Sequence, residues 1–184
     1  MASSVVHERT RARIQAMQVL YQSDFLDESA HALLEGNDYI LEEGPLEEYA
    51  SMLIEGVYNA REKIDDLLSQ ALVNWELDRV SLVEAAILRV ATFELIAKQP
   101  DVADAIAINE AVKLAKRYAG EDAARFVNGA LRGVFEKLNP LKEAPACADD
   151  VVADDVAATG EVAVGKAVDE TACTDKRVSD ESEG

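Results

Sequence analysis

The stretch LDRVSLVEAAILRVATFELIA, residues 77–97, carries apolar side chains around nearly the whole circumference of a helix. A helix that is apolar on all sides is buried on all sides. We therefore predict that this segment is the central helix of the fold, with one group of helices packed on each flank. Its large apolar residues are Leu82, Val83, Ile87, Leu88, Val90, Phe93, Leu95 and Ile96.

Helical periodicity also dominates the residues before the central stretch, where the alternation typical of strands is scarce. A first helix is predicted over residues 6–25, with Met17 and Leu20 on its buried face. A weaker helical segment follows around residues 30–34. Gly44-Pro45 then predicts the start of one long helix that extends to about residue 68, because proline suits the first helical position.

Two more helices are predicted after the central stretch, over residues 102–119 and 121–138, with Gly120 between them. Gly129 and Gly133 predict that another backbone approaches the last helix closely. The expected fold class is all-α, with about seven helices in two small bundles that share the central buried helix. We place the helical domain at residues 1–140, with subdomains at about 1–74 and 75–140.

Composition limits the function classes. The formal net charge is −18, whereas a basic isoelectric point is the usual mark of nucleic-acid binding. Only a local basic patch could therefore support that function. The N-terminal residues show no signal peptide, and no apolar run approaches the roughly 18 residues of a membrane span. We expect a cytoplasmic protein that does not contact a membrane.

Residues 141–184 differ from the rest of the chain. They carry 4 Lys and Arg against 12 Asp and Glu, and they contain no aromatic residue and no helical or strand period. Such a composition cannot bury enough apolar surface to fold, so we predict a disordered acidic tail. Both cysteines, Cys147 and Cys173, lie in this tail, with a spacing that fits no disulfide scaffold or zinc site.

The sequence contains no recognisable catalytic motif. A P-loop, a glycine-rich dinucleotide fingerprint and a nucleophile elbow are all missing. The two histidines, His7 and His31, are too isolated to indicate a metal site. We expect a protein that is not an enzyme and that needs neither a metal nor a cofactor.

Two cationic features could form the local basic patch. The first is HERTRAR, which places Arg9, Arg11 and Arg13 at the start of a helix, either for phosphate binding or as a solvated end. The second is INEAVKLAKRYAGEDAARFVNG, residues 108–129. Its cations lie opposite the predicted core stripe, and Phe126 stands beside Arg125 as a base-stacking platform or as a core residue. From spacing alone, the favoured interpretation is that Phe126 is a core residue and that the cations are ordinary solvated surface residues. The cations of its first helix are Lys113, Lys116 and Arg117.

Four blocks of the sequence together resemble the NusB family of bacterial transcription antitermination factors. They are RARIQAMQVLYQSD, WELDR, ILRVATFEL and AIAINEAVKLAKRYAGEDAARFVNGAL, and the resemblance covers about residues 8–138. It implies that the protein binds boxA RNA of nascent ribosomal RNA transcripts together with NusE, a small-subunit ribosomal protein. It also implies a place in the RNA polymerase antitermination complex. The RNA contacts that it implies are Arg9, Arg11, Arg13, Gln18, Tyr21, Arg125 and Phe126, and we add Lys113, Lys116 and Arg117.

The same resemblance places the NusE-facing surface mainly on the central helix and the helix after it, with Glu84 as a candidate. Glu84 also stands three residues after Ser81, which is the pattern of a capping box. The sequence departs from the family at Glu8 and Thr10, which interrupt the arginines, and at Ala85, where a cation is frequent. A helical protein-interaction module without RNA binding, which could be a homodimer, is the alternative function.

Overall fold

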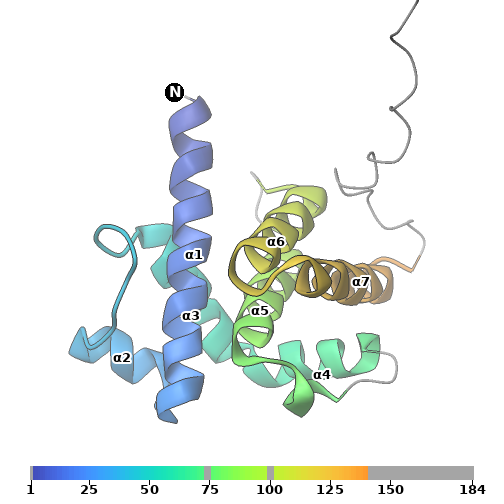
Figure 1. Ribbon diagram of the computed structural model, residues 1–184, viewed down its shortest axis with the longest axis horizontal. Coiled ribbons are helices and arrows are strands. Elements are labelled where there is room, and N and C mark those ends of the chain that lie inside the picture. Colours follow the sequence, from blue (N-terminus) through green and yellow to red (C-terminus); the bar gives the residue numbers. More distant parts are fainter. Residues whose placement is uncertain (1, 73–75, 99–101, 141–184) are drawn as a thin grey trace, which may run out of the picture. The chain divides into compact units, whose positions relative to one another are not determined.

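The computed structural model describes residues 2–72, 76–98 and 102–140, which form seven α-helices, one short 3-10 helix and no strand (Figure 1). The all-α prediction and the expected helix number are confirmed. Residues 141–184 lie outside the described residues, so the disordered tail stays a prediction, as does the subdomain boundary near residue 74. The helices are α1 (Ala2–Leu26), α2 (Ala30–Gly36), α3 (Glu48–Asn59), α4 (Arg61–Ala71), η1 (Leu77–Arg79), α5 (Leu82–Ala97), α6 (Asp104–Ala119) and α7 (Glu121–Leu138).

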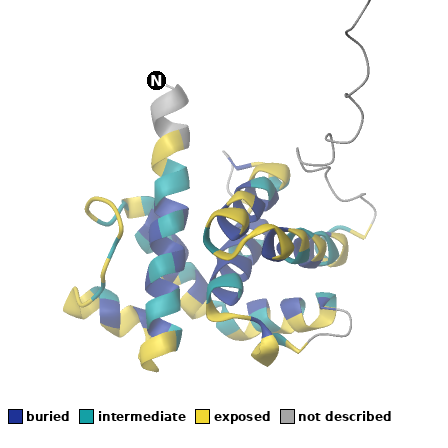
Figure 2. Ribbon diagram, viewed as in Figure 1, coloured by how far each residue is buried: buried dark blue, intermediate teal, exposed yellow. Residues whose placement is uncertain are grey.

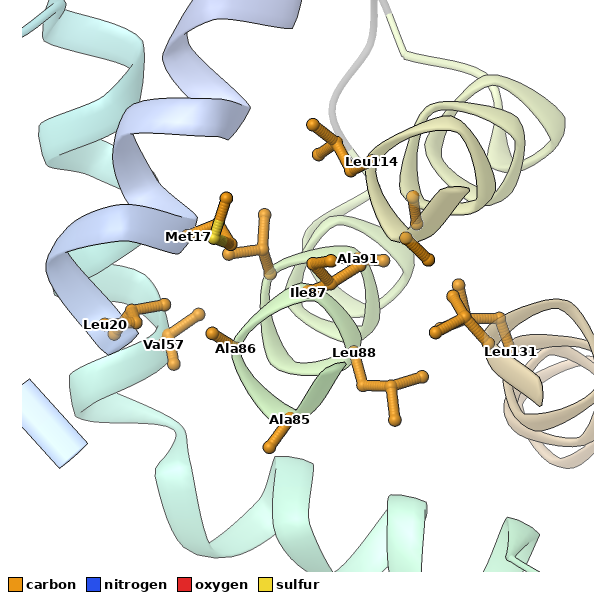
Figure 3. Packing of buried hydrophobic residues seen from close by; sticks show 14 of the residues in the cluster. Met17, Leu20, Val57, Ala85, Ala86, Ile87, Leu88, Ala91, Leu114 and Leu131 are labelled. Carbon is orange, nitrogen blue, oxygen red and sulfur yellow. The ribbon is translucent and has the colours of Figure 1, made fainter. Parts of the chain in front are cut away.

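Helix α5 is the central helix, as its composition predicts. It contacts α1, α3, α4, α6 and α7, and it is buried along most of its length (Figure 2). Met17 and Leu20 of α1 and Val57 of α3 lie on one side of it, whereas Leu131 of α7 lies on the other (Figure 3). Helices cover α5 on both flanks. If α5 had only one apolar stripe, its polar face would be buried against the apolar side chains of one flank.

Two charged residues are buried in this apolar helix, Arg89 and Glu94. Arg89 donates to Asp24 of α1 and to Asp65 of α4, each at 2.8 Å. Arg61 donates to the same two carboxylates at 2.9 and 3.0 Å. Buried charges are tolerated when they are paired and hydrogen-bonded, so this four-residue network joins α1, α4 and α5.

The single long helix predicted from Gly44-Pro45 to residue 68 is wrong. Pro45 precedes the helix, which begins at Glu48. The helix is interrupted at Ala60, whose backbone has φ −108° and ψ 14°. Both helices contact α5, but α3 also packs against α1 and α2, whereas α4 also packs against α7. One straight helix could not reach both sets of neighbours, so packing overrides a continuous helical pattern.

The two glycines of α7 differ in their surroundings. A Cβ atom on Gly133 would lie 3.2 Å from the Ala71 side chain, and the Ala71 carbonyl would be 3.4 Å away. This close approach of α4 agrees with the prediction for that position. A Cβ atom on Gly129 would meet nothing within 4 Å, so the prediction is wrong for Gly129. Gly120, with φ 96°, joins α6 to α7 as expected.

Within the described part of the chain, no helix combines the length and the apolar character that crossing a membrane requires.

Candidate nucleic-acid interface

The three arginines at the start of α1 do not form one patch. Successive helical residues are rotated by about 100°, so Arg9 and Arg13 share a face and Arg11 points to nearly the opposite side. The guanidinium groups of Arg9 and Arg13 lie 5.3 and 5.8 Å from the ring centroid of Tyr49 on α3. Arg11 pairs instead with Glu47, in the loop before α3. The structure therefore divides this predicted cluster.

Arg13 is a core residue. Its side chain is 3% exposed, and its Nη2 donates to Glu94 Oε1 of α5 at 2.8 Å. The Tyr49 hydroxyl donates to the same oxygen at 2.6 Å. Burial by itself lowers the pKa of Arg13, but the hydrogen bonds and charge of Glu94 outweigh it and raise that pKa. A buried, paired guanidinium cannot reach RNA, so the expected RNA contact of Arg13 does not fit this structure.

Arg11 meets the cations of α6 at one hollow. The hollow has a volume of about 420 Å³ and lies between α1 and α6, with Lys113 and Arg117 in its wall. Thr10 and Lys113 hydrogen-bond the Glu110 carboxylate at 2.7 and 2.9 Å. Burial by itself raises the pKa of Glu110, but these hydrogen bonds outweigh it and lower that pKa. This hollow, named the cationic hollow for Arg11, Lys113 and Arg117, also has the carboxylates of Glu43 and Glu110 in its wall, and the ionised Glu110 pairs with Lys113.

A second hollow, of about 450 Å³, lies further along the same side of α1. Gln18 and Tyr21 of α1 line it together with Tyr118 of α6. The Arg117 guanidinium lies 5.0 Å from the Tyr118 ring centroid, and Tyr21 stacks on Phe25 with ring centroids 6.0 Å apart. Aromatic faces beside guanidinium groups are the surface on which unpaired bases stack. This hollow and the cationic hollow make up the α1–α6 face.

Arg125, Phe126 and Glu84 occupy a different place, on α7 and at the start of α5. Phe126 and Glu84 line one hollow of about 240 Å³, with Arg79 and Asp122 in its wall. Phe126 is half-buried, and Arg125 is exposed and pairs with Asp122. The structure therefore places a predicted RNA contact next to the predicted partner contact.

The capping role of Glu84 is confirmed. Ser81 Oγ accepts from the Glu84 backbone N–H at 3.3 Å and donates to Glu84 Oε2 at 2.6 Å, and the Ser81 N–H donates to that carboxylate at 3.2 Å. The partner role of Glu84 stays a prediction.

Lys116 lies outside the three hollows and pairs with Glu121 at 2.7 Å.

Tyr118 and Glu42 also belong to the α1–α6 face, although neither was predicted from the sequence. Tyr118 could have been found, because it directly follows Arg117 at the exposed end of a cationic helix. Glu42 accepts from both residues but lies 75 positions before Arg117, so no local pattern could indicate it.

Among residues 2–72, 76–98 and 102–140, no group of three His, Cys, Asp or Glu could hold a metal ion.

The fold is therefore all-helical and built around one buried helix, with cations and aromatic rings near one another at its surface. A family-level comparison narrows this class. The chain belongs to the NusB family, because the sequence model of that family matches residues 10–136. This result confirms the resemblance read from the sequence.

Curated relatives support the same assignment. The chain is 42% identical to the transcription antitermination protein NusB of Saccharopolyspora erythraea over 133 residues, which cover 71% of this chain and 90% of that relative. It is 44% identical to the protein of the same name from Desulfotalea psychrophila, over 68% of this chain and 94% of the relative. That name describes a regulatory role, which confirms the prediction that the chain is not an enzyme.

Solved structures share the fold. NusB of T. maritima superposes with a TM-score of 0.60 and 32% sequence identity, over 74% of this chain and 93% of that one. A chain from a crystal structure of the antitermination factors NusB and NusE in complex with double-stranded RNA superposes with a TM-score of 0.59 and 29% identity. That match covers 71% of this chain and 98% of the other.

Proposed function

We propose that this protein binds single-stranded boxA RNA of nascent ribosomal RNA transcripts together with NusE. In this way it would support processive ribosomal RNA transcription as part of the RNA polymerase antitermination complex in the cytoplasm. The observation that carries the proposal is the α1–α6 face, where Arg11, Lys113 and Arg117 line one hollow and Tyr21 and Tyr118 line the next. The cations would pair with RNA phosphates, and unstacked bases would stack on the aromatic rings.

Three features of the chain set the expected affinity. The body is acidic, few cations can contact phosphate, and several of these already pair with carboxylates. RNA binding by the chain alone should therefore be modest and should weaken as salt rises. A partner protein that adds contacts would raise the affinity through linked binding.

The hollow that Phe126 shares with Glu84 suggests where partner and RNA meet. A protein docked on the Glu84 side would lie beside Phe126 and Arg125, so it could complete a site that this chain forms only in part. We therefore assign RNA contacts to the α1–α6 face and to the Arg125–Phe126 pair, with Glu84 at the partner boundary. Arg13 is left out because it is buried.

A fluorescence titration tests this proposal, with a labelled boxA-like RNA, with and without NusE, at two salt concentrations. Phe126→Ala should weaken binding roughly 5-fold or more, because stacking contributes about 1–3 kcal/mol per base. Arg125→Ala should weaken it severalfold without lowering the melting temperature. Lys63→Ala on α4 removes the same charge from an exposed position outside the three hollows and should change little.

Absence of RNA binding at low salt, even with NusE, would refute the proposal. If the protein instead formed a stable homodimer without binding RNA, the alternative of a helical interaction module would be correct. Sedimentation analysis of the same samples separates these outcomes.

A further inference from the structure

Three glutamines of α1 hold the loop that precedes α3. Gln15, Gln18 and Gln22 stand three and four residues apart, so their side chains lie on one face of the helix. Each of them hydrogen-bonds the backbone of residues 40–47, which keeps this loop, the acidic strap, along α1. Gln15 Nε2 donates to the carbonyls of Glu43 and Pro45 at 3.0 and 2.8 Å, and Gln15 Oε1 accepts from the Glu47 backbone N–H at 2.9 Å. Gln18 Oε1 accepts from the Glu42 backbone N–H at 3.2 Å. The Gln22 amide donates to the Ile40 carbonyl and accepts from the Ile40 N–H, each at 2.8 Å.

The side chain of Glu42 extends from the acidic strap onto α6. Its Oε1 accepts from Arg117 Nη2 at 3.1 Å, and its Oε2 accepts from the Tyr118 hydroxyl at 2.5 Å. Gln18 Nε2 donates to the same Oε2 at 3.2 Å. The Glu42 carboxylate therefore accepts hydrogen bonds from one cation and two neutral donors of the α1–α6 face.

The titration of these groups agrees with a charged contact. The hydrogen bond from Tyr118, together with the charge of Arg117, lowers the pKa of Glu42, so its carboxylate is ionised at neutral pH. Burial and the bond to Glu42 raise the pKa of Tyr118 to about 12, so its hydroxyl keeps its proton and remains a donor.

A carboxylate held by a guanidinium and a hydroxyl makes the contacts that a phosphate oxygen makes. We infer that Glu42 is an internal competitor for RNA phosphate, which occupies Arg117 and Tyr118 until RNA displaces it. This inference rests on the proposed RNA binding and adds a residue that limits its strength. Glu42 thereby selects against weakly bound polyanions, because each must first replace an existing carboxylate.

The strap itself does not depend on the Glu42 carboxylate. Gln15 and Gln22 bind only backbone groups of the loop, and Gln18 also accepts from the Glu42 backbone N–H. A neutral side chain at position 42 should therefore leave the loop in place and remove only the competing charge.

The test compares Glu42→Gln with Glu55→Gln in the full-length chain. Both variants lose one negative charge, but Glu55 is exposed on α3, away from the three hollows. With a labelled single-stranded boxA-like RNA at low salt, Glu42→Gln should tighten binding about two- to fivefold, the range expected for an exposed ion pair. Glu55→Gln should stay within about 1.5-fold of the unmodified protein, because exposed charges at a distance are largely screened.

A double-mutant cycle with Arg117→Ala identifies the competing contact. In the Arg117→Ala background, Glu42→Gln should give less than half of its gain in affinity, because the main group that Glu42 occupies is gone. Equal melting temperatures for Glu42→Gln and the unmodified protein would show that the strap is retained, and Glu42→Ala provides a second neutral variant for the same comparison.

Each outcome decides the inference. If the unmodified protein binds RNA and Glu42→Gln behaves like Glu55→Gln, or binds more weakly, Glu42 is not a competitor. If none of the variants binds RNA even with NusE, the proposed function fails and the inference fails with it.

Discussion

Replacing Arg13 with alanine separates a core role for this arginine from the RNA contact that the sequence predicts. In the structure, Arg13 and Glu94 have side chains that are 3% and 1% exposed. Arg13 Nε lies 3.1 and 3.0 Å from the two Glu94 oxygens, and Nη2 lies 2.8 Å from Oε1. In Arg13→Ala, the buried carboxylate would keep only the Tyr49 hydroxyl as a donor among these groups.

The expected cost follows from this geometry. Removing one partner of a buried ion pair leaves an uncompensated charge and typically costs about 3–5 kcal/mol of unfolding free energy. For a helical domain of this size, such a loss lowers the melting temperature by roughly 10–20 °C. Urea unfolding followed by far-UV circular dichroism measures it as a lower midpoint with an unchanged slope.

Two controls make the result interpretable. Arg125→Ala removes an exposed arginine and should change stability by no more than about 0.5 kcal/mol. The double variant Arg13→Met with Glu94→Leu removes both charges and should recover most of the loss, because apolar side chains of similar volume can replace a buried pair. A loss below about 1 kcal/mol in Arg13→Ala, together with weaker RNA binding, would refute the core role.

Other expected outcomes concern glycine packing and acid stability. Gly56→Ala should destabilise the protein by about 1–3 kcal/mol, because the new Cβ would lie 2.0 Å from Phe93 Cζ. Gly129→Ala should instead stabilise it by about 0.5–1 kcal/mol, since nothing lies within 4 Å and alanine favours the helix; denaturant midpoints test both. Because the pKa of Glu110 is lowered on folding, its ionised form stabilises the protein above the ordinary value of 4.5, and this contribution is lost as pH falls. Glu110→Gln should therefore flatten the decline of the melting temperature between about pH 5 and pH 3, and an unchanged slope would contradict that assignment.

Local pattern was a good guide to the helices around α5. The apolar circumference of residues 82–97 indicated a buried central helix, and the spacing of Ser81 and Glu84 indicated its capping box. The glycine at position 120 marked the boundary between α6 and α7. These features depend on neighbours within one or two helical turns, which is the range over which a sequence pattern acts.

The candidate site was predicted less completely. Lys113, Arg117 and Tyr21 lie on the α1–α6 face. Helical spacing in HERTRAR separates Arg11 from the other two arginines, but it does not show that Arg13 is buried. The partner of Arg13 is 81 positions away in the sequence, and the partner of Arg117 is 75 positions away. Periodicity can place a charge on a helix face, but it cannot say which helix will cover that face.

The sequence by itself determined the helical class and the buried central helix, because helix formation and apolar burial follow from local composition. Its four blocks of resemblance also indicated the family. The tertiary structure alone decided that the chain breaks at Ala60, that Arg13 is buried, and that Glu42 reaches Arg117 and Tyr118. An ion pair between residues far apart in the sequence forms only after packing has brought their segments together, so the same residue type can stabilise a core or face solvent. That physical difference separates a cation that could bind RNA from one that holds the fold together.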